Sequence, residues 1–472
     1  MNGYKKKQNP HYEYEKTELE NNILLRVANI INIVLMTLPF LVAWFVYYDA
    51  RNYLPFYFWG NWAMIILFVI IYCLCARAYD VFQIYNLRIQ ELVYSQLIAC
   101  IITDFIMYFI ICILGRSFLN FVPILILLAA QGALATAWAY FSHRWYFSRY
   151  KQPKTIIVHG PTTREIDKRF KTADMAVRFD VRDIVNVGDI RADFSTLDEY
   201  EVVFLKGVES EFRDKILKYC VYNDKVAYVI PFAGDLMISG AQRVNLYNLP
   251  LLRVNRYSPA PEYLFVKRLL DIIFSFIGLV VLSPLFLVVA IIIKASDGGD
   301  VIYKQVRLTK NGKSFWMYKF RSMVMDAEKD GVARLSTGDN DPRVTKFGHF
   351  IRKTRIDELP QLMNIIKGEM SFVGPRPERP EIAEEYRKEL VDFDLRLQVR
   401  AGLTGYAQVH GKYNTTPKDK LMLDLMYISK PSLAEDARIV FSTIKTIFLK
   451  ESTEGIEQGR TTSMPQRDKT TD

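Results

Sequence analysis

Four long apolar stretches occupy the first third of the sequence and limit what the chain can fold into. Each is close to the ~20 residues that an α-helix needs to cross the hydrocarbon core of a bilayer. None carries the polar face that a helix of a water-soluble bundle presents to solvent. The sequence therefore predicts four transmembrane helices, in the approximate ranges Leu24–Tyr48, Tyr57–Ala76, Leu92–Leu114 and Phe118–Phe141.

Basic residues alternate in density around these stretches. Because lysine and arginine concentrate in cytoplasmic loops, their positions predict that both ends of the helix bundle lie in the cytoplasm. The polar N-terminus lacks the features of a cleavable signal peptide, so we expect the first helix itself to direct insertion. The basic residues concerned are Lys5, Lys6, Lys7, Arg26, Arg77, Arg88, Arg144, Arg149, Lys151 and Lys154.

The overall composition agrees with a membrane protein, since 50% of the residues are hydrophobic and 14% are aromatic. A net charge of +10 would also suit a nucleic-acid-binding protein. Basic residues beside apolar spans, however, more often serve lipid headgroups, topology and phosphorylated substrates, and we expect no nucleic-acid partner. The five cysteines form neither a CxxC metal motif nor a disulfide framework.

From Lys154 to about Asn255 the composition changes to that of a soluble α/β domain. Short apolar runs separated by charged stretches predict buried parallel strands joined by helices. The first run ends at His159-Gly160-Pro161, where a dinucleotide-binding fold would carry its GxGxxG turn. Only one glycine is present there, so we predict a degenerate Rossmann-like module with a regulatory or structural role.

A fifth apolar stretch, Leu269–Ile293, contains Ser283-Pro284 near its centre. Proline removes a backbone donor and clashes with the preceding turn, so a straight spanning helix is disfavoured. A re-entrant helix that bends at Ser283-Pro284 would keep the basic residues at both of its ends on the cytoplasmic side. A kinked helix that crosses the membrane fully is the alternative.

Beyond Lys294 the chain is polar and basic, and three blocks stand out there. The first block, Lys304 to Met323, predicts a strand, a turn and a second strand. Lys319 and Arg321 lie two residues apart on the second strand, so they share a face. They are suited to bracket a phosphate, although a solvated basic strand would look the same.

The second block contains the adjacent carboxylates Asp357 and Glu358. Pro360 is tolerated only in the first turn of a helix, so we expect a helix to begin near Asp357. Helix capping alone explains most such pairs. Here Arg352, Lys353 and Arg355 precede the pair and Arg376, between two prolines, follows it. This setting favours phosphate chemistry in which the two carboxylates divide the work.

A third block, residues 400–414, is rich in glycines that let a backbone approach a ligand closely. Taken in order, these blocks resemble the bacterial sugar transferases, in particular the large monotopic polyprenyl-phosphate phosphoglycosyl transferases. The resemblance spans about residues 262–450 and rests on Ser283-Pro284, on Tyr318 to Met323, on Arg355 with Asp357 to Gln361, on Gly374 to Pro377 and on Gly402 to Gly405. Ser429 to Ser432 depart from the pattern, because relatives often carry an aromatic residue before that serine.

The resemblance implies a membrane protein with a four-helix transmembrane bundle, a Rossmann-like α/β module and a monotopic α/β catalytic domain with a re-entrant helix. We expect the protein in the bacterial inner membrane, with the catalytic domain on the cytoplasmic face. The ranges are a tail at 1–23, the bundle at 24–150, the module at 151–255, the re-entrant region at 256–294, the catalytic domain at 295–450 and a polar tail at 451–472.

The resemblance also implies an activity: transfer of a hexose-1-phosphate from a UDP-sugar to undecaprenyl phosphate, with release of UMP, at the start of exopolysaccharide, capsule or O-antigen synthesis. Asp357 is then the nucleophile that forms a covalent phosphosugar intermediate, Glu358 is its supporting acid or base, and Mg²⁺ binds at Asp357. Lys319, Arg321, Arg355 and Arg376 are candidate phosphate ligands.

Two other functions remain open at this point. A membrane-anchored nucleotide-sugar dehydratase or epimerase shares four helices and a dinucleotide fold, but it needs the glycine-rich loop that is missing after Val158. A non-catalytic polysaccharide-assembly protein would leave the basic blocks around Asp357 unused. Family base rates make glucose the first expectation for the sugar and galactose the second, and a homo-oligomer remains possible.

Overall fold

A computed structural model describes residues 10–51, 56, 59–161, 173–190, 194–246, 249–254, 256–257, 259–325, 341, 343–411 and 415–448. The predicted C-terminal tail at 451–472 lies outside these residues. The chain divides into two compact units, Met1–Pro231 and Phe232–Asp472.

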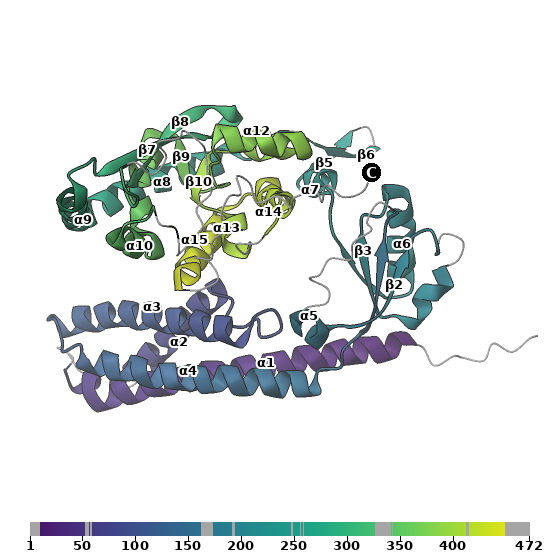
Figure 1. Ribbon diagram of the computed structural model, residues 1–472. Coiled ribbons are helices and arrows are strands. Elements are labelled where there is room, and N and C mark those ends of the chain that lie inside the picture. Colours follow the sequence, from purple (N-terminus) through teal and green to yellow (C-terminus); the bar gives the residue numbers. More distant parts are fainter. Residues whose placement is uncertain are drawn as a thin grey trace, which may run out of the picture. The chain divides into compact units, whose positions relative to one another are not determined.

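Four long helices form a bundle in the first unit (Figure 1). All four are long and apolar enough to cross a membrane, as the sequence predicts. α1 already begins at Pro10, so part of the predicted N-terminal tail is helical. The helices are α1 (Pro10–Ala43, continued by a π turn at Trp44–Tyr48 and a 3₁₀ turn at Asp49–Arg51), α2 (Gly60–Ala78), α3 (Ile89–Gly115) and α4 (Val122–Arg149).

Aromatic and aliphatic side chains fill the interior of the bundle, with Trp44, Phe68 and Tyr72 fully buried. Apolar side chains also cover much of its outer surface, as at Ile66 and Ile113, which are 59% and 74% exposed. A water-soluble bundle would carry polar residues at such positions, so this outer surface suits lipid.

The α/β part of the first unit contains a four-stranded parallel sheet in the order β2-β1-β3-β4, which confirms the predicted parallel strands. At the carboxyl ends of β1 and β3 the backbones of Gly160 and Gly207 approach so closely that a Cβ on Gly160 would collide with the Gly207 carbonyl. The elements are β1 (Lys154–His159), α5 (Ala173–Arg178), β2 (Asp180–Asn186), η4 (Phe194–Glu199), β3 (Val202–Lys206), α6 (Ser210–Tyr222) and β4 (Val226–Val229).

The second unit begins at Phe232. The reason is that α7 packs its buried Ala233 and Leu236 with Leu421 and Leu425 of α14. Its elements before the predicted carboxylate pair are α7 (Ala233–Ser239), β5 (Gln242–Leu246), β6 (Leu249–Arg253), α8 (Pro261–Val281), α9 (Ser283–Asp297), β7 (Ile302–Leu308), η5 (Lys310–Gly312), β8 (Ser314–Phe320) and α10 (Lys346–Lys353).

Three small sheets, rather than one large one, organise the described part of this unit: the antiparallel pairs β5–β6 and β7–β8, and the parallel pair β9–β10. Between β8 and β9 lies a shared core of Phe315, Met317, Leu362, Ile365 and Met370. The remaining elements are η7 (Ile356–Glu358), α11 (Gln361–Lys367), β9 (Met370–Val373), α12 (Pro380–Glu389), η8 (Phe393–Gln398), β10 (Ala401–Thr404), α13 (Tyr406–His410), α14 (Pro417–Ser429) and α15 (Leu433–Phe448).

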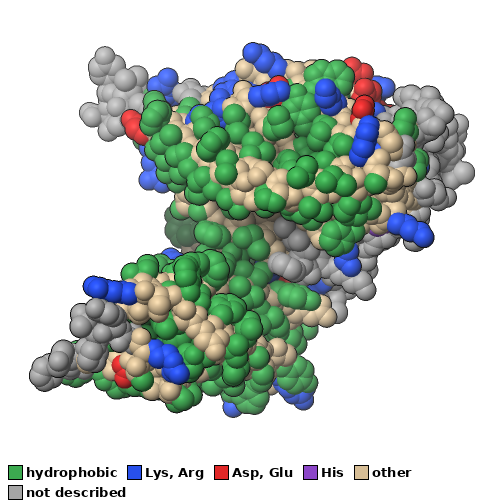
Figure 2. All heavy atoms as spheres, turned by 90° about the vertical axis from the view of Figure 1, so that its left-hand side faces the viewer, with side chains coloured by type: hydrophobic (Ala, Val, Ile, Leu, Met, Phe, Trp, Pro, Cys, Tyr) green, Lys and Arg blue, Asp and Glu red, His purple; other side chains and the backbone are tan. Residues whose placement is uncertain are grey.

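The fifth apolar stretch is broken where the sequence predicts it to be. α8 and α9 meet at Leu282 and are bent by 60° relative to each other. Pro284 lies in the first turn of α9, where its missing N–H costs nothing, and Ser283 Oγ donates to the Val280 carbonyl at 2.7 Å. Figure 2 looks onto the side where α9 lies and shows hydrophobic side chains spread across this part of the surface, with lysines and arginines mostly toward its edges.

Candidate active site

The two carboxylates lie in a single 3₁₀ turn that directly precedes α11. The expectation of an α-helix beginning near Asp357 was therefore wrong by one turn. Pro360 has no N–H with which to close an α-helical hydrogen bond to Ile356. The turn is closed instead by hydrogen bonds that span three residues, from Glu358 N to Arg355 O and from Leu359 N to Ile356 O, both at 3.2 Å. Arg355 enters the turn in the left-handed conformation, with φ 58°.

Both carboxylates are buried, each residue being only 7% exposed. Burying an ionised carboxylate is costly unless cations or hydrogen bonds compensate it. Glu358 has such compensation, because its Oε1 lies 2.7 Å from Lys319 Nζ, 3.0 Å from Arg376 Nη2 and 3.8 Å from Arg355 Nη1. Three of the four predicted phosphate ligands thus converge on one oxygen atom.

The strand pattern of β8 explains the position of Lys319. Phe315 and Met317 alternate along β8 with their side chains in the core, and Lys319 has the same parity, so it faces inward toward the carboxylates. Arg321 directly follows β8, and its N–H donates to the Val301 carbonyl at 2.9 Å, in line with the β7–β8 register. Its guanidinium lies so close to Gly299 that a Cβ there would collide with it.

Arg376 reaches the site from the loop that follows β9. Gly374 donates to the Thr404 carbonyl and Gly402 donates to the Pro375 carbonyl, both at 2.9 Å, so the loop continues along β10. A Cβ on Gly374 would collide with the Arg400 carbonyl, which explains the glycine at this position.

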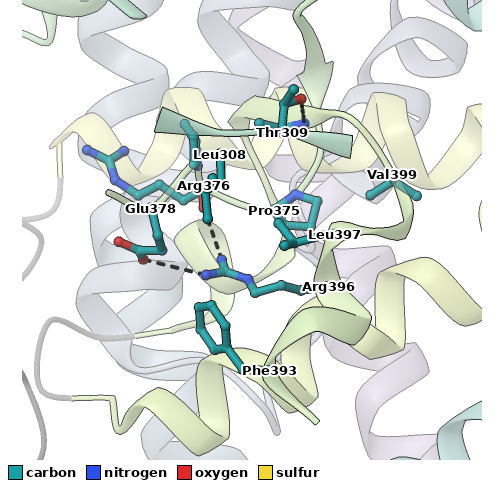
Figure 3. Close-up of a pocket in the computed structure, with 11 residues that line it drawn as sticks. Leu308, Thr309, Pro375, Arg376, Glu378, Phe393, Arg396, Leu397 and Val399 are labelled. Carbon is teal, nitrogen blue, oxygen red and sulfur yellow. Dashed lines mark hydrogen bonds and ion pairs between the residues drawn. The ribbon is translucent and has the colours of Figure 1, made fainter. Parts of the chain in front are cut away.

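A small pocket beneath this loop contains the groups that hold the Arg376 backbone (Figure 3). Arg396 is buried, donates from Nη2 to the Arg376 carbonyl at 3.1 Å, and forms ion pairs with Asp424 at 2.7 Å and Glu378 at 3.6 Å. In Figure 3 the Arg376 side chain extends away from the pocket while its backbone faces Arg396. The pocket therefore supports the loop and leaves the guanidinium directed to Glu358.

The surroundings give the two carboxylates opposite electrostatic properties. Burial by itself would raise the pKa of Glu358, but Lys319, Arg376 and Arg355 together lower it well below the ordinary glutamate value. Burial raises the pKa of Asp357, and the nearby Lys319 only partly opposes this effect. The three cations therefore favour the ionised form of Glu358, whereas Asp357 is the more basic of the two carboxylates.

Asp357 also differs from Glu358 in its contacts. Its Oδ1 is buried and has no hydrogen-bond partner among the described residues. An available carboxylate oxygen beside several cations is suited to attack a phosphorus atom or to bind a hard metal ion. Within the described residues no group of three or more His, Cys, Asp or Glu side chains gathers.

Arg352 is a further residue of the site, which was not among the candidate site residues predicted from the sequence. Its Nη1 is buried without a hydrogen-bond partner among the described residues, and its charge helps to lower the pKa of Asp357. Its place just before the carboxylate pair indicated a basic setting, but its spacing to Asp357 did not predict this buried position. In the third block, the His410 ring contacts the Tyr406 ring in a tilted arrangement, with 4.3 Å between ring centroids, and residues 412–414 lie outside the described part of the chain.

Comparison with known proteins matches residues 262–450 to the family model of the bacterial sugar transferases. The chain is 40% identical over 208 residues to a UDP-N-acetylgalactosamine-undecaprenyl-phosphate N-acetylgalactosaminephosphotransferase of Aeromonas hydrophila, an alignment that covers 43% of this chain and 49% of the relative. It is 38% identical over 220 residues to a UDP-glucose:undecaprenyl-phosphate glucose-1-phosphate transferase of Escherichia coli K12, covering 46% of this chain and 45% of the relative.

These alignments span about half the length of the relatives they match. A shorter relative from Bacillus subtilis, named "Putative undecaprenyl-phosphate N-acetylgalactosaminyl 1-phosphate transferase", is 50% identical over 136 residues, which cover 29% of this chain and 75% of that protein. The matched region includes Asp357, Glu358 and all three cations that bind Glu358. The chain belongs to the bacterial sugar transferase family.

Proposed function

We propose that the protein transfers a hexose-1-phosphate from a UDP-sugar to undecaprenyl phosphate and releases UMP, as the first step of a surface polysaccharide. The names of the relatives support the substrate classes. The observation that carries the proposal is the contrast within the carboxylate pair: Asp357 has an unpartnered buried oxygen, while the adjacent Glu358 collects three cations. Phosphoryl transfer needs this combination of a nucleophile and positive charge around the phosphate oxygens.

The reaction proceeds in two displacements. In the first, an Asp357 carboxylate oxygen attacks the phosphorus that carries the sugar, and the bond from this phosphorus to the UMP oxygen breaks, so that UMP leaves with the electron pair. In the second, a phosphate oxygen of undecaprenyl phosphate attacks the same phosphorus. The acyl-phosphate bond to Asp357 then breaks, which restores the carboxylate and yields the lipid-linked diphosphosugar.

Glu358 acts in this scheme by holding cations rather than by moving a proton. A general acid or base works best when its pKa lies near the operating pH, and the pKa of Glu358 is far below that range. Lys319 and Arg376, which it binds at 2.7 and 3.0 Å, are thereby kept beside Asp357. Both cations then neutralise the phosphate oxygens of the incoming UDP-sugar.

Mg²⁺ fits this site with Asp357 as its protein ligand. The unpartnered Oδ1 of Asp357 is the kind of hard oxygen donor that Mg²⁺ takes, usually together with substrate phosphates and water. When bound, Mg²⁺ would neutralise charge on the diphosphate and favour the departure of UMP. Glu358 is a poorer ligand, because its Oε1 already has three cationic partners.

We propose further that α8 and α9 form a re-entrant element in the cytoplasmic leaflet of the inner membrane. The 60° bend at Leu282 supports this. So does the surface of α8, where Phe265, Phe274 and Phe276 are between 56% and 70% exposed, as befits side chains in contact with lipid. A site at this level would receive the phosphate of undecaprenyl phosphate where it meets the headgroups.

The test incubates detergent-solubilised protein with Mg²⁺, undecaprenyl phosphate and a panel of UDP-sugars that includes the glucose, galactose and N-acetylgalactosamine forms. UMP release with one of them is the expected result. Asp357→Asn should abolish both UMP release and the labelled phosphosugar adduct on the protein, because an amide oxygen is a poor nucleophile. A folded wild-type protein that releases no UMP with any donor contradicts the activity, and wild-type turnover by Asp357→Asn contradicts the nucleophile.

A further inference from the structure

Helix α8 carries a polar stripe on an otherwise apolar surface. Tyr263, Lys267, Asp271 and Ser275 recur at intervals of four residues, which places them along one face of the helix. Asp271 and Ser275 are buried, at 3% and 0% exposed, whereas their apolar neighbours on the other faces are largely exposed. The membrane helix therefore docks on the catalytic unit through its polar face.

The N-terminal part of this stripe, Tyr263 and Lys267, contacts α14 and α15. Lys267 Nζ lies 2.8 Å from Asp436 Oδ2, Tyr263 donates to the same oxygen at 2.9 Å, and Tyr427 donates to the other oxygen of Asp436 at 2.8 Å. This network fixes one end of α8 against the catalytic unit. It also lies next to β9, since the Tyr427 hydroxyl is 3.4 Å from the Val373 carbonyl oxygen.

Asp271 contacts β9 directly. Its Oδ1 accepts a hydrogen bond from the Phe372 backbone N–H at 3.0 Å. β9 pairs with β10 along one edge, so within the described sheet the carboxylate of Asp271 takes the place of a neighbouring strand at the other edge. Because a backbone N–H left without a partner away from water is destabilising, this hydrogen bond favours the observed position of β9 against α8.

The strand that Asp271 holds leads directly to Arg376. β9 ends at Val373, and the following Gly374 and Pro375 bond to β10 before the chain reaches Arg376. Arg268, which lies three residues before Asp271 on α8, donates to the carbonyls of Ile365 and Ile366 at 2.6 and 2.8 Å, near the end of α11. Helix α8 thus forms hydrogen bonds to both α11 and β9, the two elements on either side of the Glu358–Arg376 ion pair.

We propose that Asp271 is a positioning residue, which sets the place of Arg376 relative to Glu358 by holding the Phe372 N–H of β9. The inference rests on the proposed phosphoryl transfer. It makes the membrane-embedded helix a structural part of the active site, although no residue of α8 is assigned contact with substrate. Lipid contact at α8 and alignment of Arg376 are thereby coupled.

The test compares Asp271→Leu, which has no acceptor, with Asp271→Asn, which keeps the oxygen that accepts from Phe372. Because misplacement of a catalytic group by about 1 Å can cost on the order of 10²-fold, we expect Asp271→Leu to lower kcat by at least about tenfold with little change in the KM for UDP-sugar. Asp271→Asn should stay within about threefold of wild type. Ile272→Ala, at an exposed apolar neighbour, is the matched control.

A double-mutant cycle separates positioning from loss of stability. If Asp271 acts through Arg376, Asp271→Leu should lower kcat much less in an Arg376→Ala background than in the wild type. An equal loss in both backgrounds, or equal losses in the Leu and Asn variants, overturns the proposal. If Asp271→Leu yields no folded protein, Asp271→Ala takes its place in the cycle. If the wild-type protein releases UMP and the Asp271 variants behave otherwise than expected, this inference fails while the proposed function stands.

Discussion

Asp357 and Glu358 are adjacent and equally buried, yet the residues around them separate their chemistry. Glu358 Oε1 is shared by Lys319, Arg376 and Arg355, so its charge is compensated and its proton affinity is low. Asp357 lies in the same turn but keeps an oxygen free of hydrogen bonds within the described structure. A 3₁₀ turn makes this division possible, because consecutive side chains on it diverge.

The Asp357 pKa predicts how activity depends on pH. Burial raises this pKa above the ordinary aspartate value, and a carboxylate must be ionised to attack phosphorus, so activity falls as the pH drops through the raised pKa. The positive charge of Lys319 opposes the rise. Lys319→Met should therefore move the acidic limb of the kcat/KM profile to higher pH, in addition to lowering kcat.

The measurement is the rate of UMP release across the acid range for wild type and Lys319→Met. Arg321→Met is the matched control, because the Arg321 guanidinium packs against Gly299 and is not among the charges that shift Asp357 most. Its acidic limb should coincide with that of wild type. A Lys319→Met limb that stays in place or moves to lower pH would show that Lys319 does not set the pKa of the nucleophile.

At the scale of elements, β8 shows what the sequence could and could not predict. Alternation along Phe315 to Lys319 is a local property, and in the structure it turns Lys319 toward the core, next to Glu358. Arg321 directly follows β8, and its N–H donates to the Val301 carbonyl in line with the β7–β8 register. The partners of such side chains are set by tertiary contacts: Lys319 binds Glu358, whereas the Arg321 guanidinium lies next to Gly299.

Helix α8 likewise shows what could and could not be predicted from the sequence. Its apolar composition and the break at Ser283-Pro284 were apparent from the sequence, and the four long helices of the bundle were equally clear. The polar stripe through Asp271 was also present in the sequence. It was missed because the high average hydropathy of the stretch concealed a spacing of four residues.

The loop after β9 depends on glycine at position 374. A Cβ there would collide with the Arg400 carbonyl of the adjoining segment, so Gly374→Ala must displace the backbone that leads to Arg376. We expect kcat to fall by at least about tenfold, together with a lower thermal midpoint. UMP release and thermal unfolding of the purified variant measure both effects.

Gly234→Ala is the matched control for this substitution. Gly234 lies in α7 with no atom within 4 Å of an added Cβ, so alanine should stabilise the helix by roughly 0.5–1 kcal/mol and leave kcat unchanged. Wild-type kcat in Gly374→Ala would mean that the loop can shift without moving Arg376, and the steric account of this glycine would be wrong.

At the scale of the whole molecule, α8 contacts the catalytic unit with one face and exposes apolar side chains on the others. Both features restrict the path proposed for it at the membrane. Its polar face contacts the catalytic unit from Tyr263 to Ser275, and Gly278 still packs against Leu362. A helix in contact with a water-soluble domain over most of its length cannot place that whole length in the hydrocarbon core. This contact favours the re-entrant path proposed above, in which α8 lies between the catalytic unit and the lipid, over a full crossing.

This argument predicts that both ends of the α8–α9 pair face the cytoplasm. In a variant without the five native cysteines, single cysteines at Glu262, before the bend, and at Lys310, after it, should react with a membrane-impermeant maleimide in inside-out vesicles and stay unlabelled in spheroplasts. A cysteine at Phe118, in the segment that joins α3 to α4, serves as the opposite control, since the positive-inside pattern places it outside. If Lys310→Cys is labelled in spheroplasts, the pair crosses the membrane, and the catalytic unit would lie on the side where UDP-sugars are absent.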